Sequence, residues 1–114
     1  MIPQRAVENV TIFEPQQTLQ TDVLQQQVIG ALNSEARPNI AINLSNISYI
    51  DSSGLGTLVS LHKQCEARQC TFALFGLQAY VQRLVEVIRL NRVLKIYNDE
   101  PAALEALVTT GKKA

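Results

Sequence analysis

The 114-residue sequence has neither an excess of one charge nor a long apolar run. Its 10 Lys and Arg residues balance 10 Asp and Glu residues, so the formal net charge at pH 7 is zero. Because proteins that bind nucleic acid usually carry a basic face, this balance argues against nucleic acid as the main partner, and it gives no support to a membrane surface. No apolar run approaches the ~20 residues of a membrane-spanning helix, and residues 1–5 lack the apolar segment of a secretion signal. We therefore expect a cytoplasmic protein.

Cysteine and histidine are also scarce. Cys65 and Cys70 are the only cysteines and His62 is the only histidine, so a closed zinc site would lack ligands. Cysteines in such a cytosolic chain are most often small packing residues, and a lone imidazole on an apolar helix stripe is most often packed and neutral. The sequence thus predicts neither a bound metal nor a cofactor.

Hydrophobic periodicity predicts strands alternating with helices in a single domain, residues 1–114, with flexible ends at 1–6 and 111–114. The expected strands cover residues 7–14, 39–44, 71–75 and 94–97, and the first is an edge strand or the second arm of a short hairpin. The expected helices begin at a Thr21 cap, span about 52–67 and 78–89, and follow an Asp99 cap. In the third helix, a stripe at helical spacing is expected to be core: Leu77, Val81, Leu84, Val85 and Ile88.

This order of elements predicts an α/β fold with a mostly parallel sheet of four to five strands and about four helices. In such folds, ligands and partners bind at the C-terminal ends of the strands. The turn that follows the strand at 39–44 lies at such an end, and it is the most informative stretch of the sequence.

This turn combines acidic, hydroxylated and glycine residues at the expected start of a helix. Asp51, Ser52 and Ser53 can accept hydrogen bonds from the free N–H groups of the first helical turn, while Gly54 and Gly56 allow close approach of the backbone. Because these N–H groups and the helix dipole favour negative charge, a phosphate can be accommodated there, either bound or covalent. The residues alone leave equally open that the turn merely caps a helix.

Three kinds of enzyme or nucleotide site each lack a necessary part. A P-loop needs a lysine after Gly54 and Gly56, and a dinucleotide fingerprint needs a small residue where Val59 stands. The serine hydrolase motif G-x-S-x-G is absent, and the Cα of His62 should lie about 15 Å along the same helix from that of Ser52. The sequence therefore predicts a protein without enzymatic activity, whose hydroxyl is acted upon.

Residues 51–56, preceded by the apolar strand at 40–44 and by residues 45–50, resemble the signature of STAS domains, specifically the free-standing anti-sigma factor antagonists. The resemblance continues through the segments at 72–76, 81–88 and 94–97, and it covers roughly residues 38–108. It implies a STAS fold and a role in signal transduction and transcription regulation.

The resemblance also implies a partner switch. The unphosphorylated antagonist binds an anti-sigma factor that is also a serine kinase; the kinase phosphorylates the antagonist, and a serine phosphatase restores it. The family's phosphoacceptor is the Ser directly after the Asp, here Ser52, with Ser53 as the second choice. Asp51 would hold the turn in shape, and Gly54 and Leu55 would lie under the partner.

Two departures from the family pattern fall near this turn. Members commonly carry a Gly-x-Leu/Ile-Asp segment before the first helix, where this chain has residues 15–19, so Thr18 takes the place of the acidic residue in the partner-facing loop. Asn43 stands where many members have Asp at the end of the central strand. These changes leave the fold alone and bear on the identity of the partner and of the regulated output.

Two alternatives to the switch remain open from the sequence. The domain could be a constitutive scaffold or an accessory subunit, as in a lipid-transport assembly or a stressosome-like particle, or a sensor whose turn binds a nucleotide phosphate. The sequence names neither the kinase nor the phosphatase, and it leaves open whether the chain forms a weak homodimer.

Overall fold

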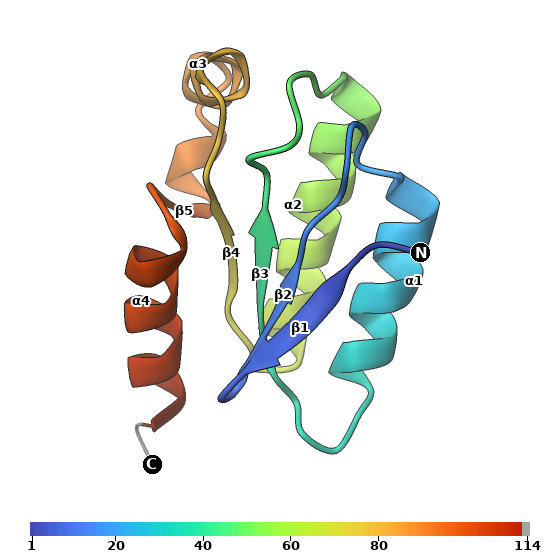
Figure 1. Cartoon of the computed structure of the whole chain (residues 1–114), viewed down its shortest axis with the longest axis vertical. Helices are drawn as coiled ribbons and strands as arrows, with labels where there is room; N and C mark the ends of the chain where they lie inside the picture. The colour runs from blue at the N-terminus through green and yellow to red at the C-terminus, as the bar shows by residue number, and fades with distance from the viewer. Residues whose placement is uncertain (113–114) are drawn as a thin grey trace.

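Five strands form one sheet, and helices cover both of its faces (Figure 1). The computed structural model describes residues 1–112. In chain order the elements are β1 (Gln4–Val7), β2 (Val10–Phe13), α1 (Thr21–Leu32), β3 (Asn39–Asn43), α2 (Ser52–Ala67), β4 (Phe72–Phe75), α3 (Ala79–Val87), the 3-10 helix η1 (Leu90–Arg92), β5 (Lys95–Tyr97) and α4 (Glu100–Lys112). The strand order is β1-β2-β3-β4-β5, with β1 antiparallel to β2 and the other neighbours parallel. The predicted α/β fold with a mostly parallel sheet is confirmed, and β1 makes the sheet mixed.

Alternate side chains of the central strands reach opposite faces of the sheet. Ile40 and Ile42 of β3 join the larger core cluster, to which α1 and α2 contribute, whereas Ala41 joins a smaller cluster under α4. The four residues of β4 repeat this alternation. Figure 1 shows α1 and α2 on one side of the sheet and α4 on the other. The central strands are therefore buried on both faces, as their continuous apolar sequences predict.

A buried asparagine ties α4 to the sheet. Asn39 begins β3, is 7% exposed, and its Nδ2 donates a hydrogen bond to the carbonyl oxygen of Leu107 in α4 at 3.0 Å. Its Oδ1 accepts a hydrogen bond from the backbone N–H of Thr71, just before β4, at 2.9 Å. One side chain thus satisfies backbone groups of two distant segments, and such groups are costly to leave unpaired when buried.

The N-terminal region forms a short hairpin, the second of the two arrangements predicted for residues 7–14, but its second arm begins only at Val10. A turn at Glu8 and Asn9 divides the region into β1 and β2, which pair as a hairpin. Glu8 has a φ of 53°, a left-handed conformation that the alternation of polar and apolar residues does not reveal. Residues 1–6 are not a free end either, because Ile2 is buried and its N–H donates a hydrogen bond to Gln27 Oε1 of α1 at 2.7 Å.

The predicted cap of the last helix is confirmed, whereas the one predicted for the first helix is not. The Oδ1 atom of Asp99 accepts a hydrogen bond from the N–H of Ala102 at 3.0 Å at the start of α4. Thr21, by contrast, is the first residue of α1 and not its cap. The cap is Gln20, which has a left-handed backbone conformation and makes no side-chain hydrogen bond to the helix.

The ends of two helices also differ from the prediction. Helix α3 ends at Val87, so Ile88 is 45% exposed and does not belong to the core stripe. Helix α4 continues through Lys112, where the sequence predicts a flexible tail over residues 111–114; residues 113–114 lie outside the described residues. No helix in the described part of the chain is long and apolar enough to cross a bilayer.

Candidate functional site

Helix α2 begins at Ser52, as the sequence predicts. Asp51 is its N-cap, because its backbone is extended and its Oδ1 accepts a hydrogen bond from the N–H of Gly54 at 2.8 Å. The residues Ser52 and Ser53 are both exposed. The first turn of α2 therefore presents two hydroxyl groups at the positive end of the helix dipole.

A surface pocket of about 400 Å³ lies beside this turn. Residues 18–21, at the start of α1, and residues 49–51, 53 and 54, at the start of α2, line it. Of the residues predicted to bind a partner, the pocket brings together Thr18, Asp51, Ser53 and Gly54, while Ser52 lies outside its lining. Because two helices begin here, the positive ends of two helix dipoles lie next to one pocket.

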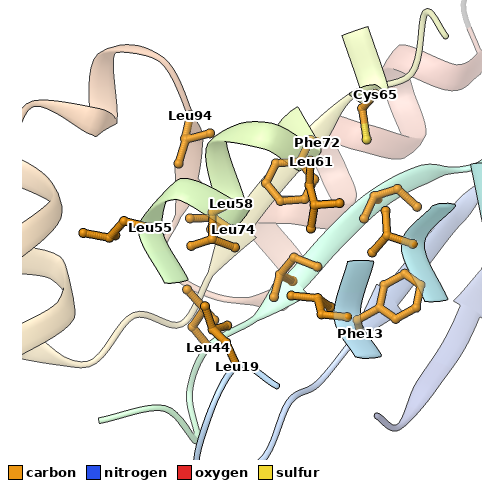
Figure 2. Packing of buried hydrophobic residues seen from close by; sticks show 14 of the residues in the cluster. Phe13, Leu19, Leu44, Leu55, Leu58, Leu61, Cys65, Phe72, Leu74 and Leu94 are labelled. Atoms are coloured by element: carbon orange, nitrogen blue, oxygen red, sulfur yellow. The ribbon is translucent and has the colours of Figure 1, made fainter. Parts of the chain in front are cut away.

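Gly54 and Leu55 are predicted to lie under a partner, but both are buried within the domain itself. Leu55 is 8% exposed and belongs to the larger core cluster, where Figure 2 shows it together with other leucines of α2. A Cβ at position 54 would lie 2.8 Å from Ile50 Cγ2 and 3.0 Å from Leu19 Cδ1. These two residues thus shape the turn from inside, because the apolar side of α2 faces the core from its first turn onward.

We expect Gly54→Ala and Gly56→Ala to change stability in opposite directions. At position 54 the added methyl group displaces the buried Ile50 side chain, which costs about 1–3 kcal/mol and outweighs a gain of up to about 1 kcal/mol in helix propensity. At Gly56 no atom apart from its chain neighbours and its own helix backbone lies within 4 Å of an added Cβ, so only the gain remains. Urea denaturation measures both free energies of unfolding, and an equal gain in the two variants would contradict the close packing at Gly54.

The loop between β2 and α1 holds Thr18 exposed beside this turn. Gln17 and Gln20 have φ values of 68° and 49°, left-handed conformations that are rare in residues other than glycine. The Gln17 N–H donates a hydrogen bond to the carbonyl oxygen of Asn46 at 3.3 Å, which joins the loop to the segment before α2. Leu19 is buried in the core and anchors the same loop. The predicted neighbourhood of Thr18 and the turn is therefore present in the fold.

Sequence reasoning missed the contacts that join the β3–α2 loop to α3. Tyr49 stacks on Tyr80 with ring centroids 6.0 Å apart and an interplanar angle of 22°. The Nε2 atom of Gln78 donates a hydrogen bond to the carbonyl oxygen of Ser45 at 2.8 Å. Asn43, at the position where the resemblance suggests an Asp in many members, accepts a hydrogen bond from the Ser45 N–H at 2.9 Å and so keeps an acceptor oxygen there. No local sequence signal pairs residues about thirty positions apart.

The histidine and the cysteines lie away from this turn. The Nε2 atom of His62 lies 3.5 Å from Glu66 Oε2, and its ring packs edge-on against Phe72. Burial raises the pKa of the Cys65 thiol to about 12 and also raises the pKa of Cys70, so both remain protonated at neutral pH. Within residues 1–112, no three His, Cys, Asp or Glu side chains come close enough together to hold a metal ion.

The mixed sheet, the helices on both faces and the capped serine turn define a small α/β domain with a polar site at the C-terminal ends of its strands. The model of the STAS domain matches residues 4–103, so this chain belongs to the STAS domain family.

Relatives and solved structures support this assignment along nearly the whole chain. A candidate anti-sigma factor antagonist of Thermotoga neapolitana, a homologue of TM1081, is 30% identical over 108 residues, which cover 92% of this chain and 96% of the relative. The crystal structure of TM1081 from Thermotoga maritima has a TM-score of 0.81 at 26% identity and covers 93% of both chains. The phosphorylated form of SpoIIAA from Bacillus has a TM-score of 0.71, 15% identity, and coverage of 93% of this chain and 99% of SpoIIAA, which shows the shared fold.

Proposed function

We propose that this chain is an anti-sigma factor antagonist that acts by partner switching in the cytoplasm. With Ser52 unphosphorylated, it binds an anti-sigma factor-like serine kinase. Phosphorylation of Ser52 by that kinase breaks the complex, and a serine phosphatase restores it. The chain itself catalyses no reaction in this scheme. The observation that carries the proposal is the exposed serine pair at the Asp51-capped start of α2, in a chain whose relatives are named antagonists.

The domain itself tolerates a phosphate at this position. A phosphoserine adds about −1.5 to −2 charge, which the N-terminus of α2 stabilises by up to ~1 kcal/mol and which the Asp51 carboxylate repels. Since SpoIIAA has been solved in a phosphorylated form, its fold accommodates a phosphate, and we carry that property over to this chain.

A docked partner meets a larger change than the domain does. Before phosphorylation the partner covers a neutral hydroxyl group, and after phosphorylation it faces a dianion. An unpaired charge buried at an interface costs about 2–5 kcal/mol. This difference converts phosphorylation of one exposed side chain into dissociation without unfolding the domain. Ser53 is the second choice of acceptor, because it is equally exposed and lines the pocket.

Mass spectrometry of the protein from its native cells tests this proposal. Intact-mass and peptide spectra from at least two growth conditions are expected to show one phosphate on Ser52 whose occupancy changes with the condition. A strain that carries Ser52→Ala is the control and should lose that phosphate. A phosphate on Ser53 would make Ser53 the phosphoacceptor. The absence of any phosphate under every condition would contradict the switch and favour a constitutive scaffold.

A further inference from the structure

The exposed apolar side chains of this domain are concentrated on one segment. Within the described residues, the large hydrophobic side chains that are more than a third exposed are Met1, Tyr49, Tyr80, Val87, Ile88 and Val93. All but Met1 belong to the α3–η1 region or to the loop stacked on it. Apolar side chains that gather on one part of a surface mark contact sites more often than scattered ones do.

Tyr80, Arg83 and Val87 form one continuous side of α3, because residues three, four and seven positions apart lie on the same helical face. Tyr80 is 54% exposed and Val87 is 70% exposed, so this face is open to solvent. The buried face of α3 is formed by Val81 and Val85. We define Tyr80, Arg83 and Val87, together with Tyr49, as the α3 face.

The α3 face is continuous with the proposed phosphorylation site. Tyr49 stacks on Tyr80 and also lines the pocket that Asp51 and Ser53 share. Figure 1 shows α3 at the same end of the sheet as the β3–α2 loop. The stacking contact already restricts the two rings relative to each other, which lowers the side-chain entropy that is lost on binding. Rigid aromatic side chains of this kind are frequent anchors at protein interfaces.

The charge of this region identifies the kind of partner. Residues 78–95 contain four basic side chains and one acidic side chain, a local charge of +3 in a chain whose total is zero. Within the described residues, Arg83, Arg89 and Arg92 form no ion pair, while Glu86 accepts a hydrogen bond from Gln82. These guanidinium groups are thus available to carboxylates on another molecule. A mixed aromatic, aliphatic and arginine surface of modest charge fits a protein better than a nucleic acid.

We propose that the α3 face, together with Arg89 at the N-cap of η1 and Arg92 at its last residue, binds an acidic, partly apolar surface of the same protein partner that the Ser52 turn controls. This inference rests on the proposed function and adds to it the chemistry of the partner. The stacked tyrosines provide the anchor, and the arginines select the partner by charge. Phosphorylation of Ser52 then acts at the edge of this interface, where Tyr49 joins the two halves.

Photo-crosslinking in the native cells tests this inference. The full-length chain carries p-benzoylphenylalanine in place of Val87, alone or with the triple change Arg83→Glu, Arg89→Glu and Arg92→Glu. We expect a crosslink to a protein segment rich in Asp and Glu, and a yield at least about tenfold lower in the charge-reversed chain. The matched control places the crosslinker at Glu35, which is exposed at the opposite end of the sheet and should capture nothing comparable.

The other outcomes would overturn the inference. They are no crosslink from position 87, a crosslink that survives charge reversal, and a crosslink to nucleic acid, to lipid or to a second copy of this chain. The melting temperature of the triple variant must match that of the wild type; if it does not, the Arg→Gln triple variant takes its place. Tyr80→Ala should also lower the yield, whereas Tyr80→Phe keeps the stacked ring and should preserve it.

Two further arms separate this inference from the partner switch. If the crosslink from position 87 depends on the arginines but survives Ser52→Glu, the α3 face binds its partner and the switch is wrong. In the second arm, a crosslinker replaces Ser48, beside the turn. If it captures a protein that Ser52→Glu releases, while the crosslinker at position 87 captures none, the switch stands and the α3 face is not the docking surface of the partner.

Discussion

Ser52→Glu is expected to weaken binding of the partner by tens to thousands of fold, whereas Ser52→Ala should leave the affinity nearly unchanged. The reason is the location of Ser52, which is exposed on the first turn of α2 at the C-terminal ends of the strands. A carboxylate there is covered by the partner without a matching cation, which costs about 2–5 kcal/mol. Alanine removes only a hydroxyl group. Quantitative co-purification from native cells, followed by titration of the purified partner, measures both variants.

The same substitution should leave the domain folded, so loss of binding is separable from loss of structure. A Glu in the first turn of a helix interacts favourably with the dipole by about 0.3–1 kcal/mol, which offsets repulsion from the neighbouring Asp51. Ser34→Glu is the matched control, because it introduces the same charge at an exposed serine at the opposite end of the sheet. Equal binding by wild type, Ser52→Glu and Ser52→Ala would exclude the switch at this residue.

Asn39→Ala is expected to lower the free energy of unfolding by about 2–4 kcal/mol. The substitution removes both hydrogen bonds of one side chain and leaves the N–H of Thr71 and the carbonyl oxygen of Leu107 without that partner. Each backbone group that loses its hydrogen bond in a dry environment costs about 1–3 kcal/mol. Because Leu107 lies in α4, the contact between that helix and the sheet should weaken most.

Urea denaturation followed by circular dichroism gives this free energy directly. Asn98→Ala is the control, since Asn98 is exposed and makes no side-chain hydrogen bond within the described residues, and it should change stability by less than about 0.5 kcal/mol. If Asn39→Ala also changed the free energy of unfolding by less than about 0.5 kcal/mol, the backbone groups of Thr71 and Leu107 would have found other hydrogen-bond partners.

Where the structure depends on local chemistry, the sequence predicts it well. The start of α2 at Ser52 and the Asp51 cap follow from an acidic residue and two serines that precede a helical stripe. The alternation of apolar strands with amphipathic helices predicts the mostly parallel sheet, because parallel neighbours need helical connections. Both features depend on residues close together in the chain.

Features that depend on distant residues or on unusual backbone conformations escape such reasoning. Gln17 and Gln20 adopt positive φ although neither is glycine, and glutamine gives no sequence signal for that conformation. The stack of Tyr49 on Tyr80 joins segments of different elements. Leu55 is a different case, because the family resemblance alone suggested a surface role, whereas the structure places its side chain with the buried residues of α2.

The stacked tyrosines also give the domain an intrinsic fluorescence probe beside the candidate site. The sequence contains no tryptophan and 3 tyrosines, so tyrosine emission is not masked by a stronger fluorophore. Two of these rings, Tyr49 and Tyr80, lie exposed beside the candidate site, while Tyr97 belongs to the smaller cluster under α4. The unlabelled chain therefore carries an intrinsic fluorescence signal at the surface where a partner would dock, and its intensity and lifetime can follow docking and phosphorylation in real time.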